Sequence, residues 1–472
     1  MKICDLNGKK VAVLGLGLEN LYLCDFLLKN KITKIEVRDQ KKFFDIEKSF
    51  GAGEKKVLDS IKSKLTFVLG NEYLSGLKNF DYIFRTPGIS PLNPEIVIAK
   101  KNQVVISSQI QLFFDLCPAK IIGVTGTKGK GTTASLIAEI IKKNFLPEKK
   151  VFLLGNIGQS AIDKIGQIEK NDFVILELSS FQLQDLTVSP NIAVITNLSE
   201  DHLNYHQNLS EYYDAKMNII RYQSKSDFAI INQDYLTSFE MISLADSKVF
   251  LFSGRNYVDE GAFVREISNK LYELVLRFSG KEEVVCRSDE LKIVGRHNLE
   301  NIAAASIVAK ILNIKTAIIS RVIREFEGLT HRIEYVGMIN KARFYNDSFA
   351  TNPLSTISAL DSFSEPIILI VGGSLKNCDY RPLTKKIIEQ KNIKHIVYFG
   401  QSGEIINQQL SALGFKKSIF GGEEIDEIVG LTKDLSAPGD IVLFSPASAS
   451  FGMFKNYKDR GDQFRLAVQK HL

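Results

Sequence analysis

One glycine-rich turn in this sequence has the residue types that bind a nucleotide phosphate chain. It follows the apolar run Ile121-Ile122-Gly123-Val124, precedes a helical pattern, and reads Gly126-Thr127-Lys128-Gly129-Lys130-Gly131-Thr132. The backbone N–H groups of such a turn and the N-terminus of the following helix surround an anion. Lys130 is then placed to reach the terminal phosphates of ATP, and a hydroxyl close behind it can ligate Mg²⁺.

The turn departs from the strict phosphate-loop pattern. That pattern has Ser or Thr directly after the lysine, whereas here Gly131 stands in that place and Thr132 follows. From these residues alone two interpretations stay open. The turn is either a variant ATP loop or a glycine turn that opens a helix and carries an incidental lysine.

The elements that must position this turn are short apolar strands that alternate with helical patterns in three successive stretches. This alternation is typical of α/β domains with parallel sheets. Residues 262–285 instead alternate like an antiparallel hairpin. We expect an α/β fold of three domains: a Rossmann-like N-terminal domain (1–112), a central P-loop ATPase-type domain with a mostly parallel sheet (113–327), and a Rossmann-like C-terminal domain (328–472).

Size and composition exclude several other classes of protein. A chain of 472 residues is too long for one ordinary core. It contains no run near the roughly 18 apolar residues of a membrane span, and its first residues lack the pattern of a secretory signal. Five scattered cysteines indicate reduced thiols. The net charge of +6 is mild, and the lysine-rich pieces lack the interleaved aromatic residues typical of nucleic-acid binding. We expect a cytoplasmic protein with no membrane insertion and no nucleic-acid partner.

The glycine-rich turn and a series of further motifs resemble the Mur ligase superfamily, which also contains the folylpolyglutamate synthases. The motifs of the central stretch are Gly155-Asn156-Ile157-Gly158, Glu177-Leu178-Ser179-Ser180-Phe181-Gln182-Leu183, Asn197-Leu198-Ser199-Glu200-Asp201-His202-Leu203 and His297-Asn298-Leu299-Glu300-Asn301. Those of the third stretch are Gly328-Leu329-Thr330-His331-Arg332, Asn346-Asp347-Ser348, Ser445-Pro446-Ala447-Ser448-Ala449-Ser450 and Lys455-Asn456-Tyr457-Lys458-Asp459-Arg460-Gly461. They occur in the family's order along the chain.

The resemblance implies an ATP-dependent acid–amino-acid ligase of peptidoglycan precursor synthesis. ATP would phosphorylate the carboxylate of UDP-N-acetylmuramoyl-L-alanine, and the amino group of glutamate would attack the acyl phosphate. Lys130, His202 and Lys216 would then be catalytic. Thr132 and Glu177 would ligate Mg²⁺, and Lys216 would join them as a carbamate, because carbamylation turns a cation into a carboxylate-like anion.

The same resemblance assigns the binding residues. Besides the glycine-rich turn, the residues implied for ATP are Asn301, Arg332 and Asp347, the last two delivered by closure of the third domain. Those implied for the UDP-sugar are Leu18, Glu19, Asp39 and Thr86, with Asn156 and His202 at its acyl end. Those implied for glutamate are Lys376, Ser450, Phe451 and Tyr457.

Gly15-Leu16-Gly17 begins a dinucleotide fingerprint, but Asn20 replaces its third glycine. Two departures from the family pattern also affect the assignments above. Glu19 stands where the family often has a small hydroxyl residue, and an anion is unfavourable beside a diphosphate. Phe349 replaces a usual lysine, so the acceptor stays open between D-glutamate, which we favour, and L-glutamate.

Three rival functions have to be weighed. A folylpolyglutamate synthase shares the ATP loop but normally lacks the roughly 110 residues of Rossmann-like sequence found here before it. A nicotinamide-dependent oxidoreductase built on Gly15-Leu16-Gly17 would leave Lys130 and Glu177 without purpose, and a non-catalytic subunit would not keep them. We expect a monomeric ligase that uses ATP and Mg²⁺.

Overall fold

The structure, a computed structural model, describes residues 1–156, 160–198, 208–268, 271–375 and 378–472. It divides into two compact units, which are described separately below. Unit 1 comprises Met1–Val285 and Glu300–Val322, and unit 2 comprises Cys286–Leu299 and Ile323–Leu472. Within the described residues, no helix combines the length and apolarity that crossing a membrane requires.

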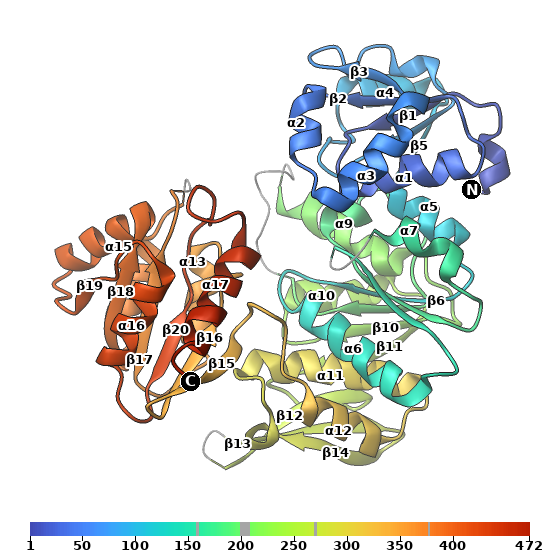
Figure 1. Ribbon diagram of the computed structural model, residues 1–472. Helices are drawn as coiled ribbons and strands as arrows, with labels where there is room; N and C mark the ends of the chain where they lie inside the picture. The colour runs from blue at the N-terminus through green and yellow to red at the C-terminus, as the bar shows by residue number, and fades with distance from the viewer. Residues whose placement is uncertain (157–159, 199–207, 269–270, 376–377) are drawn as a thin grey trace. The chain divides into compact units, whose positions relative to one another are not determined.

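Unit 1 begins with a five-stranded parallel sheet of order β3-β2-β1-β4-β5 (Figure 1). Strand β1 is buried at every position, as expected for a parallel sheet covered on both faces. The strands are β1 (Val11–Leu14), β2 (Ile35–Asp39), β3 (Thr66–Leu69), β4 (Tyr82–Arg85) and β5 (Val105–Ser107). The helices are α1 (Leu18–Lys29), α2 (Phe43–Lys48), α3 (Ala52–Ile61), α4 (Pro94–Lys101) and α5 (Gln109–Leu116).

The second sheet of unit 1 has nine strands, in the order β14-β13-β12-β11-β10-β9-β6-β8-β7. The strands are β6 (Lys120–Thr125), β7 (Val151–Gly155), β8 (Phe173–Glu177), β9 (Ile192–Ile195), β10 (Phe228–Asn232), β11 (Lys248–Ser253), β12 (Gly261–Ser268), β13 (Leu271–Phe278) and β14 (Lys281–Arg287). The helices are α6 (Lys130–Phe145), α7 (Ala161–Lys164), α8 (Ser180–Leu183), α9 (Leu209–Arg221), α10 (Leu236–Glu240), α11 (Arg296–Ile311) and α12 (Thr316–Glu325). Buried apolar residues of both sheets form one continuous core, which explains why the two sheets belong to one unit.

Unit 2 contains a six-stranded sheet of order β15-β16-β20-β17-β18-β19. Only β15 runs antiparallel to its neighbour among these strands, which the structure describes in full. The strands are β15 (Glu334–Ile339), β16 (Ala342–Asn346), β17 (Ile367–Gly372), β18 (Ile393–Phe399), β19 (Ser418–Phe420) and β20 (Ile441–Phe444). The helices are α13 (Pro353–Leu360), α14 (Arg381–Glu389), α15 (Gly400–Ala412), α16 (Ile425–Leu435) and α17 (Tyr457–Gln469).

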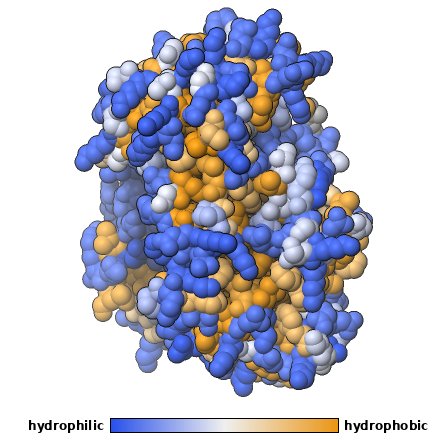
Figure 2. All heavy atoms as spheres, turned by 90° about the vertical axis from the view of Figure 1, so that its right-hand side faces the viewer, coloured by the Kyte–Doolittle hydropathy of each residue, from blue (hydrophilic) through white to orange (hydrophobic). Residues whose placement is uncertain are grey.

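The predicted α/β class is confirmed, with three mostly parallel sheets flanked by helices. The antiparallel pairing predicted within residues 262–285 is present between β12 and β13. The turn that the sequence indicates at Ser279-Gly280-Lys281 joins the neighbouring strands β13 and β14. Six short 3₁₀ segments in the described parts of the chain join or extend these elements: residues 3–6, 62–64, 77–79, 165–167, 241–244 and 288–290. On the face drawn in Figure 2, hydrophilic and apolar residues are interspersed.

Candidate active site

The glycine-rich turn connects β6 to α6 and has the strand–turn–helix geometry of a phosphate loop. Gly126 and Gly129 have φ of +149° and +83°, values that residues with a side chain rarely adopt. A Cβ at Gly126 would lie 1.9 Å from Thr196 Oγ1, and one at Gly129 would lie 2.3 Å from Asn301 Oδ1. Only glycine therefore lets this backbone pass so close to its neighbours.

Neighbouring elements hold the loop by hydrogen bonds. Asn197 Oδ1 accepts from the backbone N–H of Lys128 at 2.9 Å, and the Asn197 side-chain amide donates to the Lys128 carbonyl at 3.0 Å. Thr196 Oγ1 donates to the same carbonyl at 2.6 Å. On the other side, Thr133 of α6 donates to Asn301 Oδ1 at 3.2 Å, which brings the predicted Asn301 against the loop.

Two lysine ammonium groups converge on the loop carbonyls. Lys130 Nζ donates to the carbonyls of Gly126 at 2.9 Å and Thr127 at 3.1 Å. Lys216 Nζ, on α9, donates to the same Gly126 carbonyl at 3.0 Å and lies 4.8 Å from the centre of the Tyr212 ring. Although it lies on a helix rich in charged residues, Lys216 is only 2% exposed. Thr132 lies in the first turn of α6 and is half-buried.

Glu177 ends β8 beside the loop, because Val124 of β6 pairs with it in register. Its Oε1 accepts a 3.1 Å hydrogen bond from the side-chain amide of Asn156, which follows the adjacent strand β7. Its Oε2 is buried and has no hydrogen-bond partner. A buried carboxylate oxygen without a donor is costly unless a cation compensates it. This atom therefore fits the predicted Mg²⁺ ligand.

The first sheet brings its predicted residues to one edge. Asp39 ends β2, and its Oδ2 accepts from the Leu16 backbone N–H at 2.7 Å. The Asn20 side chain donates to the carbonyls of Leu14 at 3.0 Å and Gly15 at 2.8 Å, so the residue that breaks the dinucleotide fingerprint stabilises the turn. The Thr86 N–H donates to the Leu14 carbonyl at 3.0 Å.

Two predicted sugar contacts, Leu18 and Glu19, open α1 at this edge. Leu18 is 44% exposed, a large fraction for an apolar side chain. Glu19 does not point to open solvent, because its Oε1 accepts a 2.6 Å hydrogen bond from Gln182. Burial raises the pKa of the Glu19 carboxyl, and the bond from Gln182 opposes that rise.

In unit 2, Arg332 and Tyr457 both contact the ring of Phe349. The Arg332 guanidinium lies 3.8 Å from the centre of the Phe349 ring, and Tyr457 meets the same ring edge-to-face at 5.1 Å. Of the other predicted glutamate contacts, Ser450 is buried and Phe451 is 70% exposed. The structure thus groups Arg332 with the predicted glutamate contact Tyr457.

Asp347 is a buried carboxyl in the same unit. Its Oδ2 accepts from Ser445 Oγ at 2.7 Å, and its Oδ1 accepts from the Ile333 N–H at 3.3 Å. Burial nevertheless raises the pKa of Asp347 to about 7, against the opposing effect of those bonds and of the cations Arg332 and Arg460. The carboxyl is therefore held in a site that favours its protonated form.

One buried residue, Arg460, receives no role from the sequence analysis. Arg460 is fully buried and donates to Ser348 Oγ and to the carbonyls of Ser348 and Ser448, so it holds two predicted motifs together. Its position inside a family motif is the sequence feature that could have identified Arg460 as important. His202 and Lys376, predicted as a catalytic and a glutamate-binding residue, lie outside the described residues.

Two further features bear on ligand binding. The parts of the chain that the structure describes hold no cluster of three or more His, Cys, Asp or Glu residues suited to a metal.

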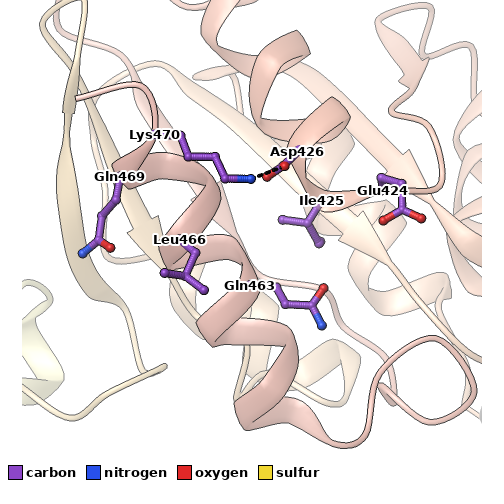
Figure 3. Close-up of a pocket in the computed structure, with 7 residues that line it drawn as sticks. All are labelled: Glu424, Ile425, Asp426, Gln463, Leu466, Gln469 and Lys470. Atoms are coloured by element: carbon purple, nitrogen blue, oxygen red, sulfur yellow. Dashed lines mark hydrogen bonds and ion pairs between the residues drawn. The ribbon is translucent and has the colours of Figure 1, made fainter.

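A groove of about 480 Å³ lies between α16 and α17, where Leu466 and Gln463 face Ile425 and Lys470 pairs with Asp426 (Figure 3). None of the predicted site residues lines this groove.

Known proteins match this chain over almost its whole length. The Mur ligase middle domain matches residues 124–309, and the Mur ligase glutamate ligase domain matches residues 331–448. The UDP-N-acetylmuramoylalanine–D-glutamate ligase of Acetivibrio thermocellus is 38% identical, with 98% of this chain and 97% of the relative covered. A protein of the same name from Clostridium kluyveri is 37% identical with the same coverage.

Solved structures show the same fold. The UDP-N-acetylmuramate–alanine ligase of Thermotoga maritima superposes with a TM-score of 0.58 at 20% identity, over 98% of this chain and 99% of that one. The MurF ligase of the same organism, in complex with ADP, gives a TM-score of 0.57 at 15% identity over 100% of both chains. The chain belongs to the Mur ligase family. It is an ATP-dependent ligase that forms amide bonds.

The raised pKa of Asp347 leads to a test of stability against pH. The pKa of Asp347 is 3.8 in the unfolded chain and about 7 in the folded protein. At a pH between these two values, the folded protein holds a proton that the unfolded chain has lost. The contribution to stability is therefore complete below about pH 4 and falls as pH rises to 7, by up to about 4 kcal/mol. The Asp347→Asn variant, which resembles the protonated acid, should lose less stability over this range. Denaturant unfolding of both proteins at pH 5 and pH 8 measures the difference, and parallel losses would contradict it.

Proposed function

We propose that this enzyme joins D-glutamate to the carboxylate of UDP-N-acetylmuramoyl-L-alanine, with ATP as the phosphoryl donor, in peptidoglycan precursor synthesis. The observation that carries the chemistry is the buried, unpaired Oε2 of Glu177, which lies at the strand end beside the glycine loop. The choice of substrate is supported by relatives that are named as D-glutamate ligases. The match with this chain covers 97% of the length of each of these relatives. Their names favour the D-form although Phe349 replaces the usual lysine.

The reaction divides into two steps. The substrate carboxylate attacks the γ-phosphorus of ATP, and ADP leaves with the electron pair of the broken P–O bond. The amino group of glutamate then attacks the acyl carbon, phosphate leaves, and the amine gives up one proton. Several anions meet in the first step, so the protein must supply cations and N–H donors in advance.

The site residues have distinct roles in this scheme. The loop Gly126 to Thr132 surrounds the phosphates through its N–H groups, and Lys130 leaves its loop carbonyls to reach the β- and γ-phosphates. Glu177 and Thr132 hold Mg²⁺, which when bound offsets the negative charge of the phosphates. Asn156 orients Glu177 through its 3.1 Å hydrogen bond and lies where the acyl end of the substrate is expected. His202, which lies outside the described residues, would serve the same end of the substrate.

The remaining predicted residues complete the two binding ends. Leu18, Glu19, Asp39 and Thr86 form the edge that receives the UDP moiety. Asn301, Arg332 and Asp347 contact ATP, and Lys376, Ser450, Phe451 and Tyr457 contact glutamate. The domains are 1–112, 113–327 and 328–472, and the enzyme works as a cytoplasmic monomer.

Lys216 is carbamylated in the working enzyme. The ammonium first loses one proton, and the neutral amine then adds CO₂ and releases a second proton, so an anion able to ligate Mg²⁺ replaces a buried cation. Lys216 is only 2% exposed, so the carbamate would form in the interior of the unit. The group would then face the loop that holds the phosphates, since it lies 3.0 Å from the Gly126 carbonyl.

The function is tested by phosphate release from ATP. We expect release that requires both UDP-N-acetylmuramoyl-L-alanine and D-glutamate, with L-glutamate giving little. Release should appear together with an amide product of the expected mass. Absence of release that depends on both co-substrates would overturn the proposal, and a preference for L-glutamate would overturn its stereochemistry.

Replacement of Lys216 tests the carbamate. Lys216→Ala should lower kcat by about a hundredfold or more, the size of effect seen when one preplaced charge-stabilising group is lost. Lys142→Ala, at an exposed lysine of α6, is the matched control and should leave kcat unchanged. A carbamate signal in the ¹³C NMR spectrum with labelled bicarbonate should vanish only in Lys216→Ala. Near-normal turnover of Lys216→Ala at low bicarbonate would count against the modification.

Glu177 provides the test of metal binding. Glu177→Gln keeps an oxygen that can accept the hydrogen bond from Asn156 but removes the negative charge. The Mg²⁺ concentration for half-maximal activity should therefore rise about tenfold or more. Glu169→Gln, which removes an exposed carboxylate before the same strand, should not change it. An unchanged Mg²⁺ requirement in Glu177→Gln would exclude Glu177 as a ligand.

A further inference from the structure

A short segment after β8 connects the two sheets of unit 1. This linking segment, residues 179–185, begins two positions after Glu177 and contains α8. Two of its side chains, Gln182 and Asp185, reach different turns at the edge of the first sheet. Both turns belong to the region assigned above to the UDP-sugar.

The first connection joins Gln182 to Glu19. The Gln182 Oε1 accepts from the Ser179 N–H at 3.1 Å and from Ser179 Oγ at 3.2 Å, which fixes the orientation of its amide. Its Nε2 is thereby directed to Glu19 Oε1, at 2.6 Å. Glu19 is in the first turn of α1, directly after Gly15-Leu16-Gly17. The bond therefore fixes this turn relative to the segment.

The second connection joins Asp185 to Arg85. Asp185 Oδ2 accepts from Arg85 Nε at 2.9 Å and also from a terminal nitrogen of the guanidinium. The Arg85 side chain is fully buried and donates further to the carbonyls of Thr86 and Ile89. Arg85 thus holds both ends of the turn that contains Thr86, and Asp185 holds Arg85.

The same segment is also bound to the helix that carries Lys216. The side-chain amide of Asn218, two residues further on α9, donates to the carbonyls of Leu183 at 3.0 Å and Gln184 at 3.3 Å. The segment therefore contacts both substrate turns, follows the Glu177 strand directly, and holds the Lys216 helix.

We propose that Glu19, Arg85 and Asp185 are positioning residues, which fix the UDP-binding turns at a set distance from the Glu177 end of the site. This inference rests on the proposed function. A substrate held at its diphosphate end then presents its carboxylate to the phosphate loop without a search over orientations. It also explains an acidic residue at position 19: the carboxylate serves as an acceptor for Gln182 rather than as a contact for the diphosphate.

The sign of a KM change separates positioning from simple electrostatics. The substrate is an anion, and Glu19 and Asp185 are both acidic. If their charge were all that mattered, their removal would lower the KM for UDP-N-acetylmuramoyl-L-alanine, because like charges repel. If they position the turns, their removal raises this KM.

The experiment compares Glu19→Ala and Asp185→Ala with wild-type enzyme. We expect the KM for UDP-N-acetylmuramoyl-L-alanine to rise about tenfold in each, within the hundredfold that a displacement of about 1 Å can cost. The KM for ATP and the melting temperature of Glu19→Ala should stay near wild type. Isothermal titration calorimetry with UDP-N-acetylmuramoyl-L-alanine should show the same weakening of Kd without turnover.

Three controls sharpen the comparison. Glu19→Gln and Asp185→Asn retain an acceptor oxygen and should recover most of the affinity. Asp59→Ala removes an exposed carboxylate from α3 and should leave KM unchanged. Because Asp185→Ala leaves a buried guanidinium uncompensated, the double variant Arg85→Met with Asp185→Leu replaces the pair by apolar residues that can still pack. It should fold and still show the raised KM.

The outcomes are separable from those of the proposed function. If wild-type enzyme shows no release that depends on both co-substrates, the proposed function fails. If wild-type enzyme is active and the alanine variants have an unchanged or lowered KM for the UDP-sugar, the positioning role is overturned. An equal rise in the KM for ATP, together with a lowered melting temperature in Glu19→Ala, would also overturn it by showing a general structural role.

Discussion

The site depends on the register of three neighbouring parallel strands. Val124 of β6 pairs with Glu177 of β8, and Glu177 pairs with Gly155 of β7. Since parallel strands in register end at one edge of the sheet, the glycine loop, the buried carboxylate and Asn156 emerge side by side. A shift of one residue would turn Glu177 to the opposite face of the sheet. The hydrogen-bond ladder thus sets the distance between the glycine loop and the buried carboxylate of Glu177.

The site concentrates buried charge at this edge, and each charge has a different compensation. The Lys130 and Lys216 ammonium groups share the Gly126 carbonyl, whereas one oxygen of Glu177 has no partner. Burial of an unpaired charge destabilises the fold, so such an arrangement indicates function rather than stability. A cation between the carboxylate and the phosphates would satisfy Glu177 and screen the substrates from one another at once.

The sequence predicted those features that depend on local pattern. The strand before Gly126, the helix after it and the hairpin in residues 262–285 follow from periodicity and turn residues, and the structure confirms them. Contacts between distant positions had no such signal. Arg85 and Asp185 are 100 positions apart, and Glu19 and Gln182 are 163 apart. Burial of Asp347 was equally hidden, because a motif identifies a residue type but not the packing that raises its pKa.

Phe349 shows how the fold accommodates a lost cation. Replacement of the usual lysine removes one positive charge, yet the aromatic ring lies directly against the Arg332 guanidinium at 3.8 Å. Such a contact stabilises the cation by about 0.5–2 kcal/mol, depending on how exposed the pair is. It also limits the movement of the guanidinium. Tyr457 supports the ring from its edge, and Arg460 supplies a second cation near Asp347. The substitution therefore removes one mobile charge and leaves the Arg332 guanidinium held against an aromatic ring.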